Sequence, residues 1–153
     1  MSDLIFRRAV AGDLPTLVAM LADDILGRHR ERPEDPLPEA YLAGFAAIEA
    51  ASNQYLLVAE RAGTIVGTLQ LTVIPGISHM GAWRGQIEAV RVAASARGQG
   101  VGQAMMRHAI GIARDHGCRM VQLTTNKARP DAKRFYEQLG FEAAHEGMKL
   151  MLG

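Results

Sequence analysis

The sequence feature that most constrains the fold is a glycine-rich run two-thirds of the way along the chain. Three glycines alternate with Gln and Val in the segment Arg97–Gly102. A strand-like segment ends near Val92 before this run, and a helical pattern reaching about His116 follows it. Glycine lets backbone N–H groups approach an anion closely, and a helix N-terminus adds partial positive charge. The run therefore predicts a pyrophosphate cradle, with a plain tight turn as the structural alternative.

The spacing of this run excludes two other nucleotide-binding loops. No Gly-Lys-Ser/Thr follows it, as a Walker A loop would require. The glycines are spaced GxGxG, whereas the dinucleotide fingerprint is GxGxxG and comes early in its fold.

Composition indicates one globular domain over residues 1–153. Hydrophobic residues make up 48% and charged residues 22% of the chain, which is typical of a chain with a full core. The formal charge is +1, so no polycation drives non-specific binding to nucleic acid. Cys118 is the single cysteine, which excludes an internal disulfide and a zinc cluster and fits a reducing compartment. The N-terminus lacks an apolar signal region, and the longest uncharged stretch is interrupted by glycines. We therefore expect a cytoplasmic protein with no membrane span and no metal.

Hydrophobic periodicity and turn residues predict a mixed α/β order. We expect strands at Leu4–Ala9, Tyr55–Glu60, Thr64–Ile74, Trp83–Val92, Arg119–Thr125, Phe141–Ala144 and Gly147–Leu152, and helices after Asp13, around Tyr41–Ile48, from the glycine run to His116, and at Pro130–Leu139. Simple alternation along Trp83–Val92 would put Gln86, Glu88, Val90 and Val92 on one face. The Pro-broken segment between the first two helices is a candidate substrate lid.

Two segments together resemble the motifs of the GNAT superfamily of acyl-CoA N-acyltransferases. Arg97, Gly100 and Gly102 match the pattern Arg/Gln-x-x-Gly-x-Gly/Ala of its first motif, and Phe135–Phe141 matches the ending FYExxGF of its second. The likeness covers about Ile87 to Phe141. It implies the GNAT fold, an α/β domain whose mixed twisted sheet of about six to seven strands is flanked by about four helices.

The resemblance also implies acetyl-CoA as the donor. Main-chain groups of Val90 and Val92 would pair with the pantetheine, and the N–H of Val90 would bind the oxyanion. Backbone N–H groups of residues 99–102, with Arg97, would hold the pyrophosphate, and Asn126 would reach the pantetheine arm. Lys133 or Arg134 would meet the 3′-phosphate. The expected donor-binding residues are Val90, Arg91, Val92, Arg97, Gly98, Gln99, Gly100, Val101, Gly102, Asn126 and Arg134.

Two residues are candidates for proton transfer. Tyr136 resembles the general acid of the family, since a phenol can protonate a departing thiolate. Its alternative is ordinary packing beside Phe135. Glu88 lies at the position where some small-amine acetyltransferases of the superfamily carry the base. Its alternative is an ion pair with Arg91 or Arg84.

The sequence thus predicts an N-acetyltransferase that moves an acetyl group from acetyl-CoA to a primary amine of a small molecule. Direct transfer in a ternary complex is expected, because no activated nucleophile is evident. The alternatives are an acetyl-CoA-binding regulatory or sensing protein of the same fold and a protein N-acetyltransferase. A homodimer is expected from the resemblance. Acidic and basic residues alternate over residues 23–35, which is typical of a solvated surface and leaves the acceptor's charge open.

Overall fold

Five strands form one sheet in the computed structural model, which describes residues 3–153. The strand order follows the chain, β1-β2-β3-β4-β5. The strands are β1 (Leu4–Arg8), β2 (Gln54–Arg61), β3 (Thr64–Ile74), β4 (Trp83–Val92) and β5 (Cys118–Gln122). The helices are α1 (Leu14–Ala22), α2 (Glu39–Ala50), the single turn α3 (Ser78–Gly81), α4 (Val101–Asp115) and α5 (Pro130–Gln138). The predicted mixed α/β fold is confirmed.

The sheet is mixed because its last pair differs in direction from the others. β1 to β4 pair antiparallel, whereas β4 and β5 pair parallel. The β2–β3 hairpin turns at Ala62 and Gly63, whose φ angles are 51° and 79°. Positive φ at both central residues is the pattern of a tight hairpin turn that matches the strand twist. The parallel pair instead needs a crossover, which α4 supplies.

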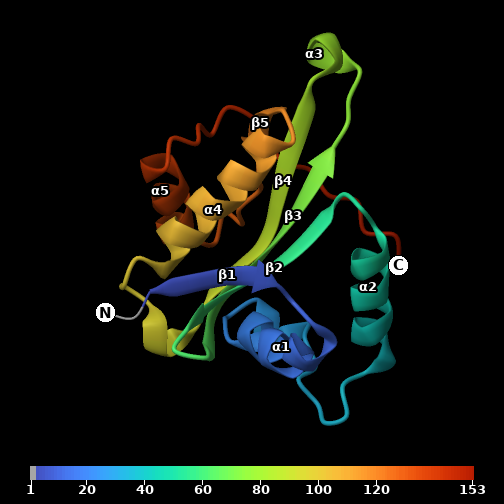
Figure 1. Cartoon of the computed structure of the whole chain (residues 1–153), viewed down its shortest axis with the longest axis vertical. Coiled ribbons are helices and arrows are strands. Elements are labelled where there is room, and N and C mark those ends of the chain that lie inside the picture. Colours follow the sequence, from blue (N-terminus) through green and yellow to red (C-terminus); the bar gives the residue numbers. More distant parts are fainter. Residues whose placement is uncertain (1–2) are drawn as a thin grey trace.

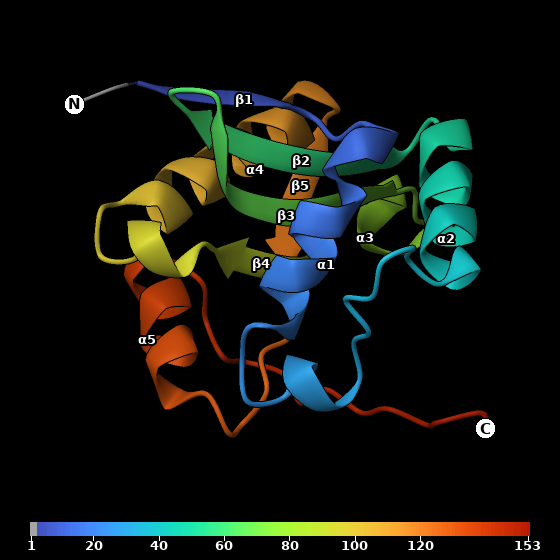
Figure 2. The same ribbon diagram turned by 90° about the horizontal axis from the view of Figure 1, so that it is seen from below.

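Helices cover both faces of the sheet, so the chain has three layers. Figure 2 shows α1 in front of the strands and α4 behind them, and Figure 1 shows the strands running between these helices. The main core lies between α4 and the sheet, where Leu69, Leu71, Ile87, Met105 and Met106 are fully buried. A smaller core lies under α1 and α2, around Leu14, Leu17, Phe45 and Val58. Burial of each such side chain stabilises the fold by about 1.5–3 kcal/mol.

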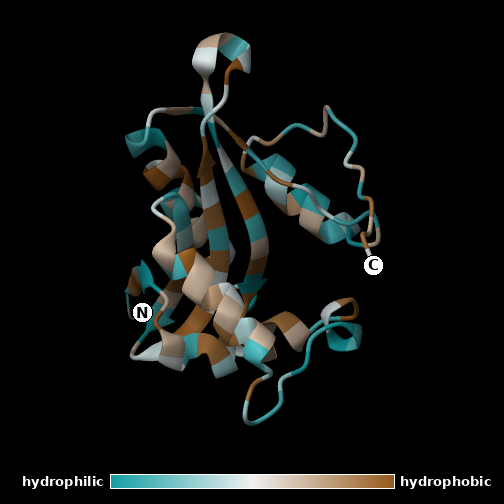
Figure 3. Ribbon diagram, turned by 90° about the vertical axis from the view of Figure 1, so that its right-hand side faces the viewer, coloured by the Kyte–Doolittle hydropathy of each residue, from teal (hydrophilic) through white to brown (hydrophobic). Residues whose placement is uncertain are grey.

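Two of the predicted strands are not strands in the structure. The segments Phe141–Ala144 and Gly147–Leu152 carry no regular structure, so the sheet has five strands where six to seven were expected. Gly147 passes beside Thr124, where β5 has already ended, and a strand exists only where a neighbouring edge supplies its hydrogen bonds. The last residues form an irregular trace that ends at the C-terminus (Figure 3). Their side chains Met148, Leu150 and Leu152 are exposed.

Helix boundaries follow the local signals closely. Pro15 lies in the first turn of α1, and Pro130 opens α5. Gly117 follows the end of α4 with a φ of 78°, a conformation that glycine adopts without steric cost. Over residues 3–153, every helix is too short or too polar to cross a bilayer.

Candidate active site

The two parallel strands, β4 and the edge strand β5, pair over only part of their length. Pairing of β4 with β5 runs from Trp83 opposite Cys118 to Gln86 opposite Gln122. Over residues 87–92 the described chain gives β4 a strand partner on one side only, which is β3. The free backbone edge of this half-strand can pair with an extended ligand as if it were another strand. Val90 and Val92, the predicted pantetheine contacts, lie in this half.

A bulge in β4 changes which side chains share a face. Ala89 has a φ of 55°, and the register shifts so that Gln70 pairs with Glu88 while Thr68 pairs with Arg91. Two residues of β4 therefore oppose one of β3, which reverses the alternation beyond the bulge.

The prediction that Glu88 shares a face with Val90 and Val92 is therefore wrong. Both valines pack against the core under α4. Glu88 and Arg91 instead lie on the α1–α2 face, level with Gln70 and Thr68 of β3. A strict period of two cannot anticipate this, because the bulge inserts one residue.

The glycine run forms a turn that delivers the chain to the N-terminus of α4. Gly98 and Gly100 have φ angles of 77° and 80°, and a Cβ at either would meet open space. A Cβ at Gly102 would instead lie 3.2 Å from the ring of Phe135, so this glycine lets α5 pack against α4. The first N–H groups of a helix lack intrahelical acceptors, so they are free for an anion.

The polar side chains of this turn contact other parts of the protein. Arg97 Nε donates to the carbonyl of Val92 at 3.3 Å, and Arg97 Nη2 lies 3.5 Å from an Asp23 carboxylate oxygen. Gln99 accepts a hydrogen bond from Arg61 at 2.7 Å. The turn is thus tied to β4 and to the segment after α1, while its backbone stays accessible.

Tyr136 lies in α5 between two other aromatic rings. Its ring centroid is 5.2 Å from that of Phe135 and 6.0 Å from that of Phe141. Burial raises the pKa of the Tyr136 phenol, while the positive charges of Arg91 and Arg129 act in the opposite direction. The phenol therefore stays protonated at neutral pH with two cations nearby. Packing beside Phe135 and a role as an acid are both compatible with this position.

Asp24 joins three segments around the site. Its Oδ1 accepts the N–H groups of Leu26 and Gly27 at 2.8 and 2.6 Å. Its Oδ2 lies 3.0 Å from Arg91 Nε of β4 and 3.0 Å from Arg129 Nη2 of the segment before α5. Burial raises the pKa of Asp24, but these backbone donors and the two arginines outweigh it and leave the pKa lowered.

Sequence reasoning missed the role of Asp24, because it treated residues 23–35 as solvated surface. The Arg91 side chain is 11% exposed and pairs with Asp24, not with Glu88 as one alternative supposed. The local signal was an Asp followed three residues later by Gly27, which is typical of a tight turn. A Cβ at Gly27 would lie 1.9 Å from the carbonyl oxygen of Leu21, so the turn requires glycine there.

Two predicted donor contacts are engaged within their own segments. Asn126 follows β5, and its Oδ1 accepts the N–H of Ala128 at 2.9 Å. Arg134 is exposed on α5 and forms an ion pair with Asp131 one turn away. Their roles towards acetyl-CoA stay predictions.

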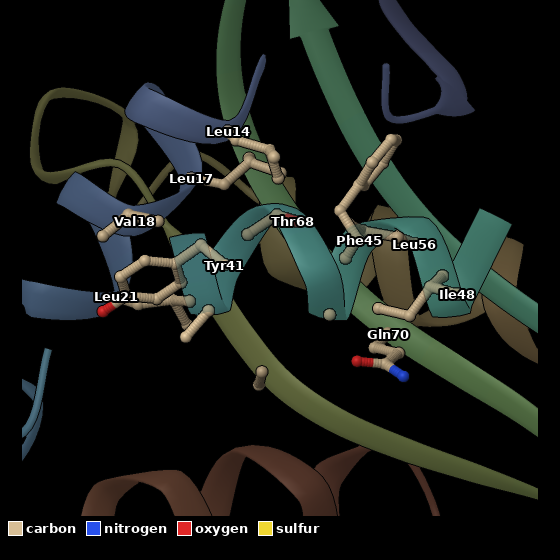
Figure 4. A pocket seen from close by; sticks show the side chains of 13 residues that line it. Leu14, Leu17, Val18, Leu21, Tyr41, Phe45, Ile48, Leu56, Thr68 and Gln70 are labelled. Atoms are coloured by element: carbon tan, nitrogen blue, oxygen red, sulfur yellow. The ribbon is translucent and has the colours of Figure 1, made fainter. Parts of the chain in front are cut away.

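A cavity of about 210 Å³ lies between α1, α2 and the sheet (Figure 4). Ala89, at the bulge, forms part of its wall together with Thr68 and Gln70. Most of the lining is apolar and comes from Leu14, Leu17, Val18, Leu21, Ala40, Tyr41, Gly44, Phe45, Ile48 and Leu56. The bulge thus brings the half-open strand to the cavity wall. The sequence did not predict a cavity here, because the apolar residues of both helices that line it have the same pattern as residues of an ordinary hydrophobic core.

Comparison with known proteins agrees with this geometry. Residues 18–141 match the profile of the Acetyltransferase (GNAT) family. The chain is 34% identical over 107 residues to aminoalkylphosphonate N-acetyltransferase of Salmonella typhimurium, covering 70% of this chain and 69% of that protein. It is 35% identical over 132 residues to glucosamine 6-phosphate N-acetyltransferase of Trypanosoma brucei brucei, covering 84% and 86%.

Solved structures extend the likeness to nearly the whole chain. The crystal structure described as a transcriptional regulator from Bacillus halodurans C-125 is 50% identical, with a TM-score of 0.95 and coverage of 98% of this chain and 100% of that one. The chain belongs to the GNAT acetyltransferase family and is an acetyl-CoA-dependent N-acetyltransferase.

Proposed function

We propose that the protein transfers the acetyl group of acetyl-CoA directly to the primary amine of a small molecule, with both substrates bound together. The observation that carries this is the meeting of the half-open strand β4, the bulge at Ala89 and an apolar cavity on the acceptor side. A cavity of about 210 Å³ suits a small molecule better than a polypeptide segment. Both curated relatives are named for small-molecule amines.

The donor would lie along the free edge of β4. Backbone groups of Val90 and Val92 would pair with the pantetheine, and residues 98–102 with Arg97 would hold the pyrophosphate at the start of α4. Arg91 would act from the other face, where it anchors the segment after α1 through Asp24.

The acid and base would act from opposite sides of the thioester. An alkylammonium has a pKa near 10, so a proton must leave before attack, and Glu88 on the α1–α2 face is the candidate base, directly or through water. The amine then forms a C–N bond at the thioester carbon, and the N–H of Val90 binds the oxyanion. As the C–S bond breaks, Tyr136 gives its proton to the CoA thiolate, and the acetylated nitrogen loses its remaining extra proton to water. Arg91 and Arg129 would stabilise the phenolate that results.

The regulatory alternative has one specific observation in its favour. The Bacillus halodurans protein, 50% identical to this chain, is described as a transcriptional regulator. An acetyl-CoA-binding sensor would keep the donor site and lose turnover, so the two candidates differ in a measurable way.

CoA-thiol release across an amine panel tests the proposal. Saturable release that depends on an amine is expected, and Tyr136→Phe should lower kcat by about 10²-fold, the scale of general acid catalysis, with donor affinity unchanged. Tyr55→Phe is the matched control, since Tyr55 pairs with His116 away from β4. Donor binding without release with any amine would favour the sensor, and an unchanged kcat would remove Tyr136 from the mechanism.

Dimerisation is proposed separately. The exposed apolar side chains at the C-terminus, Met148, Leu150, Met151 and Leu152, favour an interface there. Light scattering should give twice the monomer mass of 16.5 kDa, and a monomeric mass at micromolar concentration would refute the proposal.

A further inference from the structure

The cavity under α1 and α2 narrows the class of acceptor. We propose that the acceptor is a primary amine on an apolar group, such as an alkyl chain or an aryl ring, and that this group occupies the cavity while the amine stays beside Ala89. This inference rests on the proposed function and specifies its acceptor.

The size of the cavity fits such a group. An apolar cavity of about 150 Å³ stays dry and binds benzene. The cavity here measures about 210 Å³ and has room for a phenyl ring or an alkyl chain of several carbons. Figure 4 shows that the lining side chains come from α1, α2 and the strand that carries Thr68 and Gln70.

Each polar side chain of the wall already donates one hydrogen bond within the protein. Thr68 Oγ1 donates to a backbone carbonyl of β2 at 2.8 Å. The Tyr41 hydroxyl donates to Glu31 at 2.9 Å, and the Gln70 amide donates to Gln54 at 2.9 Å. A hydroxyl-rich ligand would lose its hydration there and gain few partners, which is costly.

The lack of positive charge among the wall residues that the structure describes also favours an apolar acceptor. The described residues that line the cavity include no Arg, Lys or His. A phosphate or phosphonate inside it would therefore lack a counter-ion. The acceptors named for the two curated relatives both carry such an anion, so this cavity favours a different kind of amine.

Position connects the cavity to the reaction. Ala89 lines it, and the chain neighbours of Ala89 are the candidate base Glu88 and the candidate oxyanion donor Val90. Gln70, which also lines it, pairs with Glu88 across the strands. An apolar group seated in the cavity would leave its amine at the wall nearest both groups.

An alkylamine series tests the inference. Each buried methylene is worth about 0.8 kcal/mol, so kcat/KM should rise about fourfold per carbon from ethylamine until the cavity is full. Hexylamine and phenethylamine should exceed ethanolamine, 2-aminoethylphosphonate and glucosamine 6-phosphate by at least tenfold. Faster turnover of any of these three polar amines would overturn the inference and leave acetyl transfer intact. If no amine releases CoA, the proposed function fails and the inference fails with it.

Variants of the cavity wall give the second measurement. A Cβ at Gly44 meets nothing within 4 Å, so Gly44→Leu should fill the space and shorten the preferred alkylamine, whereas Ile48→Ala should lengthen it. Gly111→Leu is the matched control, because this α4 glycine also has open space and lies outside the cavity. Thermal melts establish that each variant folds. An unchanged chain-length preference in both cavity variants would overturn the inference.

Discussion

Asp24→Asn is the substitution that tests most directly how the site is assembled. Asparagine is close in shape and keeps Oδ1, which accepts the N–H groups of Leu26 and Gly27. It removes the negative charge that lies 3.0 Å from both Arg91 Nε and Arg129 Nη2. The largely buried Arg91 cation would then have no counter-charge at that point.

The size of the effect follows from burial. Breaking a fully buried ion pair costs about 3–5 kcal/mol, because one charge is left uncompensated. Here the Arg91 side chain is 11% exposed, but Asp24 and Arg129 are 21% and 30% exposed, so water screens part of the interaction. We therefore expect the free energy of unfolding at pH 7 to fall by about 2–3 kcal/mol.

The pH dependence gives an independent check. The folded-state pKa of Asp24 is lowered, so its contribution is complete above the unfolded-state pKa of about 3.9 and is lost as pH falls through the folded value. The stability difference between the wild type and Asp24→Asn should be constant from pH 7 to 5 and shrink below about pH 4.

Urea unfolding at each pH measures this difference. Asp23→Asn is the matched control, since Asp23 is 61% exposed and lies 3.5 Å from Arg97, and it should change stability by less than about 0.5 kcal/mol. Equal effects of the two substitutions at pH 7, or an Asp24→Asn difference that does not shrink in acid, would refute the reasoning.

Two further predictions concern the donor site and the core. Gly100→Glu should abolish acetyl-CoA binding in calorimetry, because the new carboxylate would stand at the start of α4, where an anion is expected. Gly100→Ala separates the strain of the 80° φ from the charge, and normal binding by Gly100→Glu would refute the pyrophosphate assignment. Met105→Ala should lower the free energy of unfolding by about 2–5 kcal/mol, since Met105 is fully buried between α4 and the sheet. A loss below about 1 kcal/mol in urea would show that the core closes over the gap.

Much of the fold could be predicted from local signals in the chain. Proline marks the start of α1, and glycine or proline marks both ends of α4 and α5. The spacing of apolar residues places the strands from β1 to β4. The glycine run and the FYExxGF segment indicate a family and a donor, because both depend on residues close together in the chain. These features have short-range causes, namely backbone sterics, helix capping and the periodicity of apolar residues.

The two strands predicted near the C-terminus, which the structure does not contain, show the limit of such local signals. Apolar residues alternate with others near the C-terminus, yet a strand forms only beside a free edge, and β5 ends at Gln122. Whether an edge is present at that place depends on the rest of the sheet.

The acceptor side of the site required the tertiary structure. The positive φ at Ala89 belongs to the bulge that changes which side chains of β4 share a face. An alanine in a sequence does not indicate that conformation. Asp24 meets Arg91 and Arg129 only because β4, the segment after α1 and the segment before α5 converge. The cavity likewise arises from how α1 and α2 pack against β3. Chemistry carried by contiguous residues can thus be inferred from the chain, whereas a binding site made by distant segments depends on contacts that only folding brings together.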